Sequence, residues 1–198
     1  MRHEDVVHRA DVCALDENNV PRFVIEFQHS FLEIEKIRER ETFYPNLVWV
    51  VDLTSRKRDS TKLLREVGKL RPFVKGSNVC KAGFADEIFP VNWLHCSCPV
   101  FFECSHEGNT EQQPFFCLYP PIQGYACRFI EPVPVSVFMD LSRGIRLAEA
   151  LKKVSIDLKT LLDNQAMAQK KLEATRTNAT FEALLRQPRG WRRGRWHL

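Results

Sequence analysis

Residues 11–28 read DVCALDENNVPRFVIEFQ, and this stretch decides the fold. Two runs of mainly apolar residues flank Asp16-Glu17-Asn18-Asn19. Asparagine enters the left-handed backbone region at low cost, as a two-residue hairpin loop requires. The stretch therefore predicts two antiparallel strands that reverse direction at Asn18 and Asn19.

The register of this hairpin places two carboxylates together. If Asn18 and Asn19 form the loop, Glu17 faces Val20 and Asp11 falls opposite Glu26, with Cβ atoms about 5 Å apart. Like charges so placed destabilise a sheet unless a cation lies between them, and a hard divalent ion with oxygen ligands is a common solution. A longer loop would shift the register by one residue and turn Asp11 to the other face. The hairpin thus predicts a metal site.

Alternation of side chains along the second strand predicts its two faces. Val24, Glu26 and Gln28 share the face that carries the carboxylates. Ile25 and Phe27 are expected to be buried on the opposite face.

Several short motifs occur in a fixed order along the first quarter of the chain. They are HRADV at 8–12, VIEFQHS at 24–30, ER at 39–40 with FY at 43–44, and VWVVD at 48–52. In order and spacing they resemble the competence protein CoiA-like family, which is similar in core to the PD-(D/E)XK, restriction-endonuclease-like nucleases. Looser echoes follow at Trp93-Leu94, 99–103 and 115–119.

The resemblance implies a nuclease site. Asp11 matches the metal-binding aspartate, Glu26 the acidic member of the E-x-K half-motif, and Gln28 the position usually held by lysine. Asp11 and Glu26, helped by the carbonyl of Phe27, would bind Mg²⁺ or Mn²⁺, which acidifies a water and neutralises charge in the transition state. Glutamine can hydrogen-bond that water but supplies no charge.

A helix is expected directly after the second strand. Ser30 and Glu33 fit a capping box, with Ser30 as the N-cap residue. Arg40 and Tyr44 then project from one helix face, and the resemblance implies that both lie toward the active cleft. Alternatively, Arg40 pairs with Glu33, Glu39 or Glu41 on the surface while Tyr44 closes the helix against the core.

Nucleases of this type generally place a helix before the aspartate strand, often with another acidic residue. Only ten residues precede Asp11 here. We therefore expect that the helix is missing, either because the sequence is truncated before it or because Glu4 and Asp5 belong to a shortened form.

The remaining pattern predicts an α/β fold, with a restriction-endonuclease-like mixed sheet, flanking helices and a long C-terminal helix. Strands are expected at 47–53, 99–103, 115–119 and 125–130, a short basic helix at 60–70, and a return to the core at 135–141. The domain organisation follows as a nuclease domain at 1–141, an amphipathic helix at 142–186 and a basic, disordered tail at 187–198.

The C-terminal helix carries an apolar stripe at four-then-three spacing, formed by Leu147, Leu151, Val154, Leu158 and Leu161. Such spacing is typical of a coiled-coil seam or of a helix that packs on a partner. Self-association or a protein partner through residues 147–161 is one expectation, and local packing is the other.

Basic residues gather in two places. The candidate nucleic-acid contacts are Arg9, Arg56, Lys57, Arg58, Lys62, Arg65 and Lys69, together with Arg192, Arg193 and Arg195 in a tail that also holds Trp191 and Trp196. Phosphate backbones are drawn to basic surfaces, and aromatic rings can stack on unpaired bases. A solvated helix face and a merely basic chain end are the alternatives.

Composition bounds the class of protein. The chain has 198 residues, 44% of them hydrophobic and 27% charged, which is ordinary for a globular domain with an appendage. No apolar run is long enough for a membrane span, and seven cysteines without a secretory leader indicate reduced thiols in the cytoplasm. A zinc site at Cys96, Cys98, Cys104 and His106, with His95 adjacent, is a weaker possibility, because structural sites usually show C-x₂₋₄-C pairs.

Two hypotheses of function result. The first is a magnesium-dependent nuclease that acts on DNA, in DNA uptake or recombination. The second is a nucleic-acid-binding or recombination-accessory protein that keeps the nuclease fold without catalysis.

Overall fold

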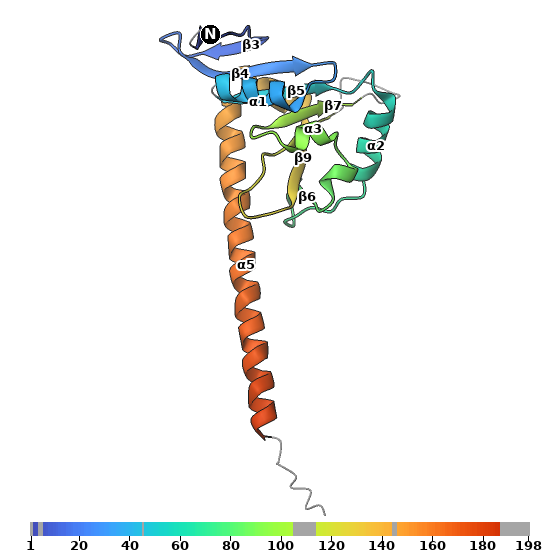
Figure 1. Cartoon of the computed structure of the whole chain (residues 1–198), viewed down its shortest axis with the longest axis vertical. Coiled ribbons are helices and arrows are strands. Elements are labelled where there is room, and N and C mark those ends of the chain that lie inside the picture. Colours follow the sequence, from blue (N-terminus) through green and yellow to red (C-terminus); the bar gives the residue numbers. More distant parts are fainter. Residues whose placement is uncertain (1, 4–5, 45, 105–113, 144–145, 187–198) are drawn as a thin grey trace, which may run out of the picture. The chain divides into compact units, whose positions relative to one another are not determined.

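The structure is a computed structural model that describes every residue except 1, 4–5, 45, 105–113, 144–145 and 187–198, with the backbone alone for 2–3, 6–7, 148 and 178–186. Its elements, in chain order, are β1 (Arg2–His3), β2 (Val6–Val7), β3 (Val12–Leu15), β4 (Pro21–Gln28), α1 (Ile34–Phe43), β5 (Leu47–Asp52), α2 (Lys57–Val67), β6 (Cys80–Ala82), the 3₁₀ turn η1 (Ala85–Glu87), α3 (Val91–Leu94), β7 (Val100–Glu103), β8 (Pro114–Leu118), β9 (Arg128–Pro134), α4 (Val135–Arg143) and α5 (Leu147–Arg186) (Figure 1).

Seven strands form one mixed sheet in the order β3-β4-β5-β7-β8-β9-β6. Strands β4, β5 and β7 run parallel, and the other pairings are antiparallel. β1 and β2 pair with each other separately. The predicted α/β fold, with flanking helices and a long C-terminal helix, is therefore confirmed.

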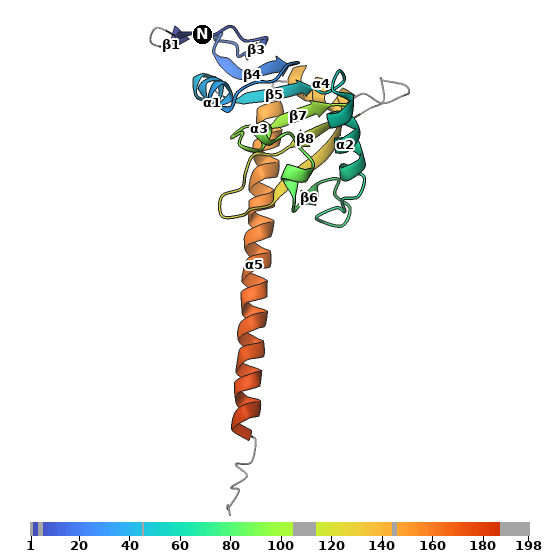
Figure 2. The ribbon, with the colours of Figure 1, turned by 45° about the vertical axis from the view of Figure 1, so that its right-hand side comes forward.

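Helices cover both faces of the centre of the sheet, which explains why β5 reads as a continuous apolar run. On one face the core contains Trp49 of β5 together with Ile37 of α1, Leu63 of α2 and Trp93 of α3. On the other face Phe138 of α4 packs against Phe101 of β7, with ring centroids 4.8 Å apart. α3 and α4 thus lie on opposite sides of the sheet (Figure 2).

The chain divides into two compact units, Met1–Ile156 and Asp157–Leu198. The first extends past the expected boundary at residue 141, because Leu147 and Leu151 are buried in it. Leu161, an expected seam residue, is exposed. Self-association through 147–161 stays a prediction, although Leu147 and Leu151 are already covered by the chain's own first unit.

Several predicted boundaries were wrong by a few residues. The basic helix α2 spans 57–67 instead of 60–70, and β9 begins at Arg128 instead of Tyr125. The segment 135–141 does return to the core, as part of helix α4. Among the described residues, no helix combines the length and apolar character that a membrane crossing requires.

Candidate functional site

The β3–β4 hairpin has the predicted register at the site but a different loop. Val12 pairs with Ile25 and Cys13 with Val24, so Asp11 adjoins Glu26 as expected. Near the turn, however, Asp16 and not Glu17 faces Val20, with its N–H donating to the Val20 carbonyl at 2.9 Å. The register shifts between Ala14 and Leu15, which compensates for the extra loop residue.

The side chain of Asp16 explains the longer loop. Its Oδ1 accepts hydrogen bonds from the N–H groups of Asn18 and Val20, at 2.8 and 2.9 Å. Aspartate often caps a turn in this way. Asn19 takes the left-handed conformation, with φ of 60°. Asp16 therefore closes a three-residue loop over Glu17, Asn18 and Asn19.

Asp11 lies just before β3 and contacts β4 through its side chain. Its Oδ2 accepts a hydrogen bond from the backbone N–H of Phe27 at 2.8 Å, and the residue is otherwise exposed. The carboxylate thus takes the place of a main-chain acceptor where the ladder with β3 has ended. This contact fixes Asp11 beside Glu26.

Glu26 is almost completely buried, with 2% of its surface exposed. Its Oε2 accepts a hydrogen bond from Arg40 Nη1 at 2.5 Å. Burial raises the pKa of Glu26; the positive charge of Arg40 opposes that rise and the negative charge of Asp11 adds to it. Within the described part of the chain, Oε1 is buried and accepts no hydrogen bond.

Arg40 contacts this carboxylate, and Tyr44 lies close enough for the charge of Glu26 to act on it. Arg40 lies on α1, with its guanidinium carbon 5.8 Å from the centre of the Trp49 ring. Tyr44 follows the helix end and is buried, and its N–H donates to the Arg40 carbonyl at 2.9 Å. Burial and the nearby Glu26 raise the pKa of Tyr44 to about 12. The alternative in which Arg40 pairs with Glu33, Glu39 or Glu41 was wrong, whereas its expectation that Tyr44 closes the helix against the core is confirmed.

The predicted capping box was also wrong. Helix α1 begins at Ile34, and neither Ser30 nor Glu33 caps it through its side chain. Instead, the carbonyl and hydroxyl oxygens of Ser30 accept hydrogen bonds from Gln28 Nε2 at 2.9 and 3.0 Å. The buried amide of Gln28 is therefore turned toward the β4–α1 loop, the segment 29–33.

Phe27 departs from its predicted burial, with 41% of its surface exposed. Ile25, on the same face of β4, is buried as expected, whereas Val12 on the neighbouring strand is exposed. The helices that cover the centre of the sheet leave this part of the hairpin uncovered. The role of the Phe27 carbonyl as a metal ligand stays a prediction.

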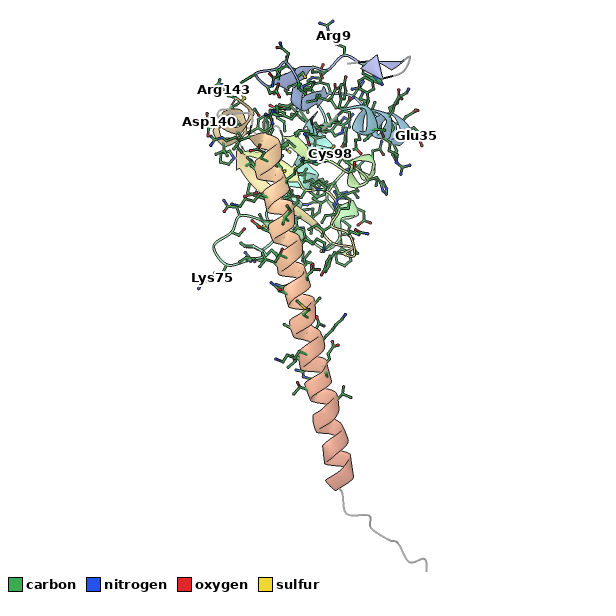
Figure 3. All side chains as sticks on the ribbon, turned by 90° about the vertical axis from the view of Figure 1, so that its left-hand side faces the viewer. Arg9, Glu35, Lys75, Cys98, Asp140 and Arg143 are labelled. Carbon is green, nitrogen blue, oxygen red and sulfur yellow. The ribbon has the colours of Figure 1, made fainter. Side chains whose placement is uncertain are left out.

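The predicted nucleic-acid contacts fall into separate groups. Arg65 and Lys69 pair with Glu66, each at 2.8 Å, and Arg56 precedes α2. Lys57, Arg58 and Lys62 line a hollow of about 760 Å³ along α2 together with Asp59, Thr61 and Arg65. Arg9 is exposed and points away from the sheet (Figure 3). Arg192, Arg193 and Arg195 lie outside the described residues.

The sequence prediction missed a polar cluster where the parallel strands end. His29 Nδ1 lies 2.9 Å from Asp52 Oδ2, and Asp52 Oδ1 accepts a hydrogen bond from the N–H of Thr54 at 2.7 Å. Glu103 ends the neighbouring strand, and burial followed by the charge of Asp52 raises its pKa. Because carboxyl ends of parallel strands meet at one edge, this cluster could have been predicted from the polar residue that follows each apolar run.

The zinc alternative gains no support. Cys98, inside the first unit (Figure 3), donates through Sγ to Glu41 Oε1 at 3.2 Å, and burial raises the pKa of Cys96 and Cys98 far above the usual thiol range. His106 lies outside the described residues. In the described ranges, no three His, Cys, Asp or Glu side chains converge so as to hold a metal ion.

Asp11, Glu26, Arg40 and Tyr44 therefore form the candidate site. Gln28 lies next to it on the same strand, whereas the predicted basic contacts come from other elements. The chain matches no protein-family model, no curated protein and no solved structure.

Proposed function

We propose that this protein is a metal-dependent nuclease that hydrolyses phosphodiester bonds of DNA, with a restriction-endonuclease-like core. The observation that carries the proposal is the convergence of four residues: Asp11 just before β3, Glu26 of β4, Arg40 of α1, and Tyr44 directly after α1. The resemblance to CoiA-like proteins implies that these four residues belong to the nuclease active site. The family's association with competence favours a role in DNA uptake or recombination.

The donor set suits a hard divalent cation. Glu26 Oε1 is a buried carboxylate oxygen without a hydrogen bond in the described residues, and the neighbouring Asp11 carboxylate is exposed. Mg²⁺ is usually held by one or two carboxylates and completes its shell with waters. Asp11 and Glu26, with the Phe27 carbonyl, would hold Mg²⁺ or Mn²⁺. When bound, the ion would acidify a water and neutralise charge on the phosphodiester.

The other residues of the site, Arg40, Tyr44 and Gln28, offset the negative charge of these carboxylates or offer hydrogen bonds beside them. Arg40 supplies the positive charge that allows Glu26 to stay buried. The Tyr44 hydroxyl, buried and without a hydrogen bond among the described residues, offers a donor toward Glu26 or a phosphate oxygen. The carbonyl of Gln28 can accept a hydrogen bond from a water, but its amide nitrogen is already occupied by Ser30.

A non-catalytic, accessory role in nucleic-acid binding or recombination is the second candidate. The observation in its favour concerns Gln28, which takes the position usually held by lysine but carries no positive charge. Its side-chain amide also donates its hydrogen bonds to Ser30. In this case the fold and the basic helix α2 would serve binding only.

Incubation of the purified protein with circular single-stranded DNA and with plasmid DNA tests the proposal. We expect cleavage with Mg²⁺ or Mn²⁺ and none with EDTA, because the two carboxylates cannot activate a water without the ion. DNA binding without cleavage in either metal would support the accessory role instead.

Metal binding should also stabilise the fold. Millimolar Mg²⁺ or Mn²⁺ should raise the melting temperature of the wild-type protein, since an ion that binds only the native state stabilises it by mass action. Asp11→Asn should lose this shift, and Glu103→Gln should keep it, because Glu103 lies on the opposite face of the sheet. Equal shifts in all three proteins would argue against an ion at Asp11 and Glu26.

The basic side of α2 should set the salt dependence of DNA binding. Replacing Lys57 and Arg58 by alanine should weaken binding to single-stranded DNA and reduce the slope of log affinity against log salt by up to about 0.7 for each lost phosphate contact. The matched pair Lys75→Ala and Lys81→Ala removes the same charge elsewhere on the first unit. Binding isotherms over a salt series measure both slopes, and equal slopes would remove α2 from the DNA surface.

A further inference from the structure

We propose that Phe31 stacks on an unpaired base of single-stranded DNA beside the candidate active site. The inference rests on the proposed function, because it names the form of DNA that this site takes. Phe31 lies in the β4–α1 loop, three residues after Gln28, and 69% of its surface is exposed. Single exposed apolar side chains are common on protein surfaces, so the position of Phe31, and not its exposure alone, points to an occupant.

Hydrogen bonds on both sides of Phe31 hold the backbone of the loop in place. Before it, Ser30 accepts two hydrogen bonds from Gln28 Nε2. After it, the Leu32 carbonyl accepts a hydrogen bond from Asn92 Nδ2 of α3 at 2.8 Å. The loop is thereby tied to β4 on one side and to α3 on the other. Because the loop backbone is already ordered, little backbone entropy is lost when a base stacks on Phe31.

A basic helix begins close in the fold to the β4–α1 loop that carries Phe31. His29 of the same loop lies 2.9 Å from Asp52 at the end of β5, so the β4–α1 loop adjoins the segment that leads into α2. α2 begins at Lys57 and Arg58, and the strand arrowheads of β4 and β7 point toward it (Figure 1). Phosphates bound along α2 would place a base of the same strand near Phe31.

The stacking itself favours a single strand over a duplex. An aromatic side chain can stack only on a base whose face is uncovered, as in single strands, whereas the bases inside a duplex are already stacked on one another.

Equilibrium binding of a short oligothymidylate and of a duplex tests the proposal. Measurements in EDTA report binding without cleavage. Phe31→Ala should weaken binding of the oligothymidylate about fivefold or more, because stacking of one base on an aromatic ring contributes at least that much. Duplex binding should change less than about twofold. Phe31→Trp should restore the affinity, and its added fluorescence, relative to the wild type, should be quenched by the oligonucleotide.

Phe84→Ala is the matched control, since Phe84 is 73% exposed but lies outside the β4–α1 loop. Its affinity should equal that of the wild type. If the wild type binds the oligothymidylate and Phe31→Ala binds it equally well, the stacking role is overturned while the proposed nuclease stands. If the wild type binds no DNA, both fall. A change in oligomeric state with unchanged DNA affinity would make Phe31 part of a protein interface instead.

Discussion

Asp11→Asn should lower the rate of metal-dependent DNA cleavage by about a hundredfold or more. The substitution removes the negative charge that would bind the ion, and loss of a single charge-stabilising group at a reacting centre commonly has an effect of this size. Single-turnover cleavage of saturating DNA, measured in Mg²⁺ and in Mn²⁺, gives the rate without the contribution of binding.

Asparagine is the appropriate replacement because its side-chain oxygen can still accept the hydrogen bond from the Phe27 N–H. Asp52→Asn is the matched control, since Asp52 lies on the neighbouring strand β5 in the His29 cluster. We expect the control to cleave at a rate close to that of the wild type. A fully active Asp11→Asn protein would show that the metal site lies elsewhere.

Arg40→Ala should reduce the free energy of unfolding by about 2–3 kcal/mol near neutral pH, because it leaves the buried Glu26 carboxylate without its countercharge. This value lies at or just below the range for a fully buried pair, about 3–5 kcal/mol, because Arg40 itself is partly exposed. Urea unfolding measures the loss. Lys36→Ala, which breaks the exposed pair with Glu39, should cost less than about 0.5 kcal/mol.

The size of the Arg40→Ala effect should depend on pH. Burial raises the pKa of Glu26 above its unfolded value, so the folded state binds the carboxyl proton of Glu26 more tightly than the unfolded state does. The contribution of Glu26 to stability therefore falls as the pH rises from the unfolded pKa through the folded pKa. Removing Arg40 takes away the influence that lowers this pKa. The loss of stability should therefore be larger at about pH 8 than at about pH 5.

A double variant separates the ion pair from other effects of Arg40. Arg40→Ala with Glu26→Gln should regain part of the lost stability, because the neutral amide is less costly to bury than a carboxylate. If the double variant is as unstable as the sum of the single variants, the contact of Arg40 with the Trp49 ring, and not the pair with Glu26, carries its contribution.

The hairpin shows how much of the site the sequence alone could predict. Alternation and two opposed acids were enough to place Asp11 beside Glu26, although the assumed loop was one residue too short. The register survived because the Asp16 turn lengthens the loop and the irregularity after Ala14 compensates for it. A side-chain turn and a compensating bulge act together, and neither leaves a clear signal in the pattern of apolar residues.

The features that the sequence did not predict depend on contacts between elements that are distant along the chain. The pair of Arg40 with Glu26 depends on how α1 lies across the sheet, which no local pattern determines. Ser30 resembled an N-cap, but its oxygens accept hydrogen bonds from the buried Gln28, and the helix starts four residues later. Phe27 was expected inside because it is apolar, yet its exposure depends on how far the covering helices reach.

The hydrogen bond from the Phe27 N–H to Asp11 gives this aspartate a structural role in addition to any role in chemistry. β3 is an edge strand of four residues, and the Asp11 side chain extends its attachment to β4 by one further hydrogen bond. A descendant that had lost catalysis would still benefit from an acceptor at this position. An aspartate retained at position 11 in related chains would therefore say little about whether they cleave DNA. A glutamate retained at position 26 would be the stronger indication of nuclease activity, because burying a carboxylate destabilises the fold.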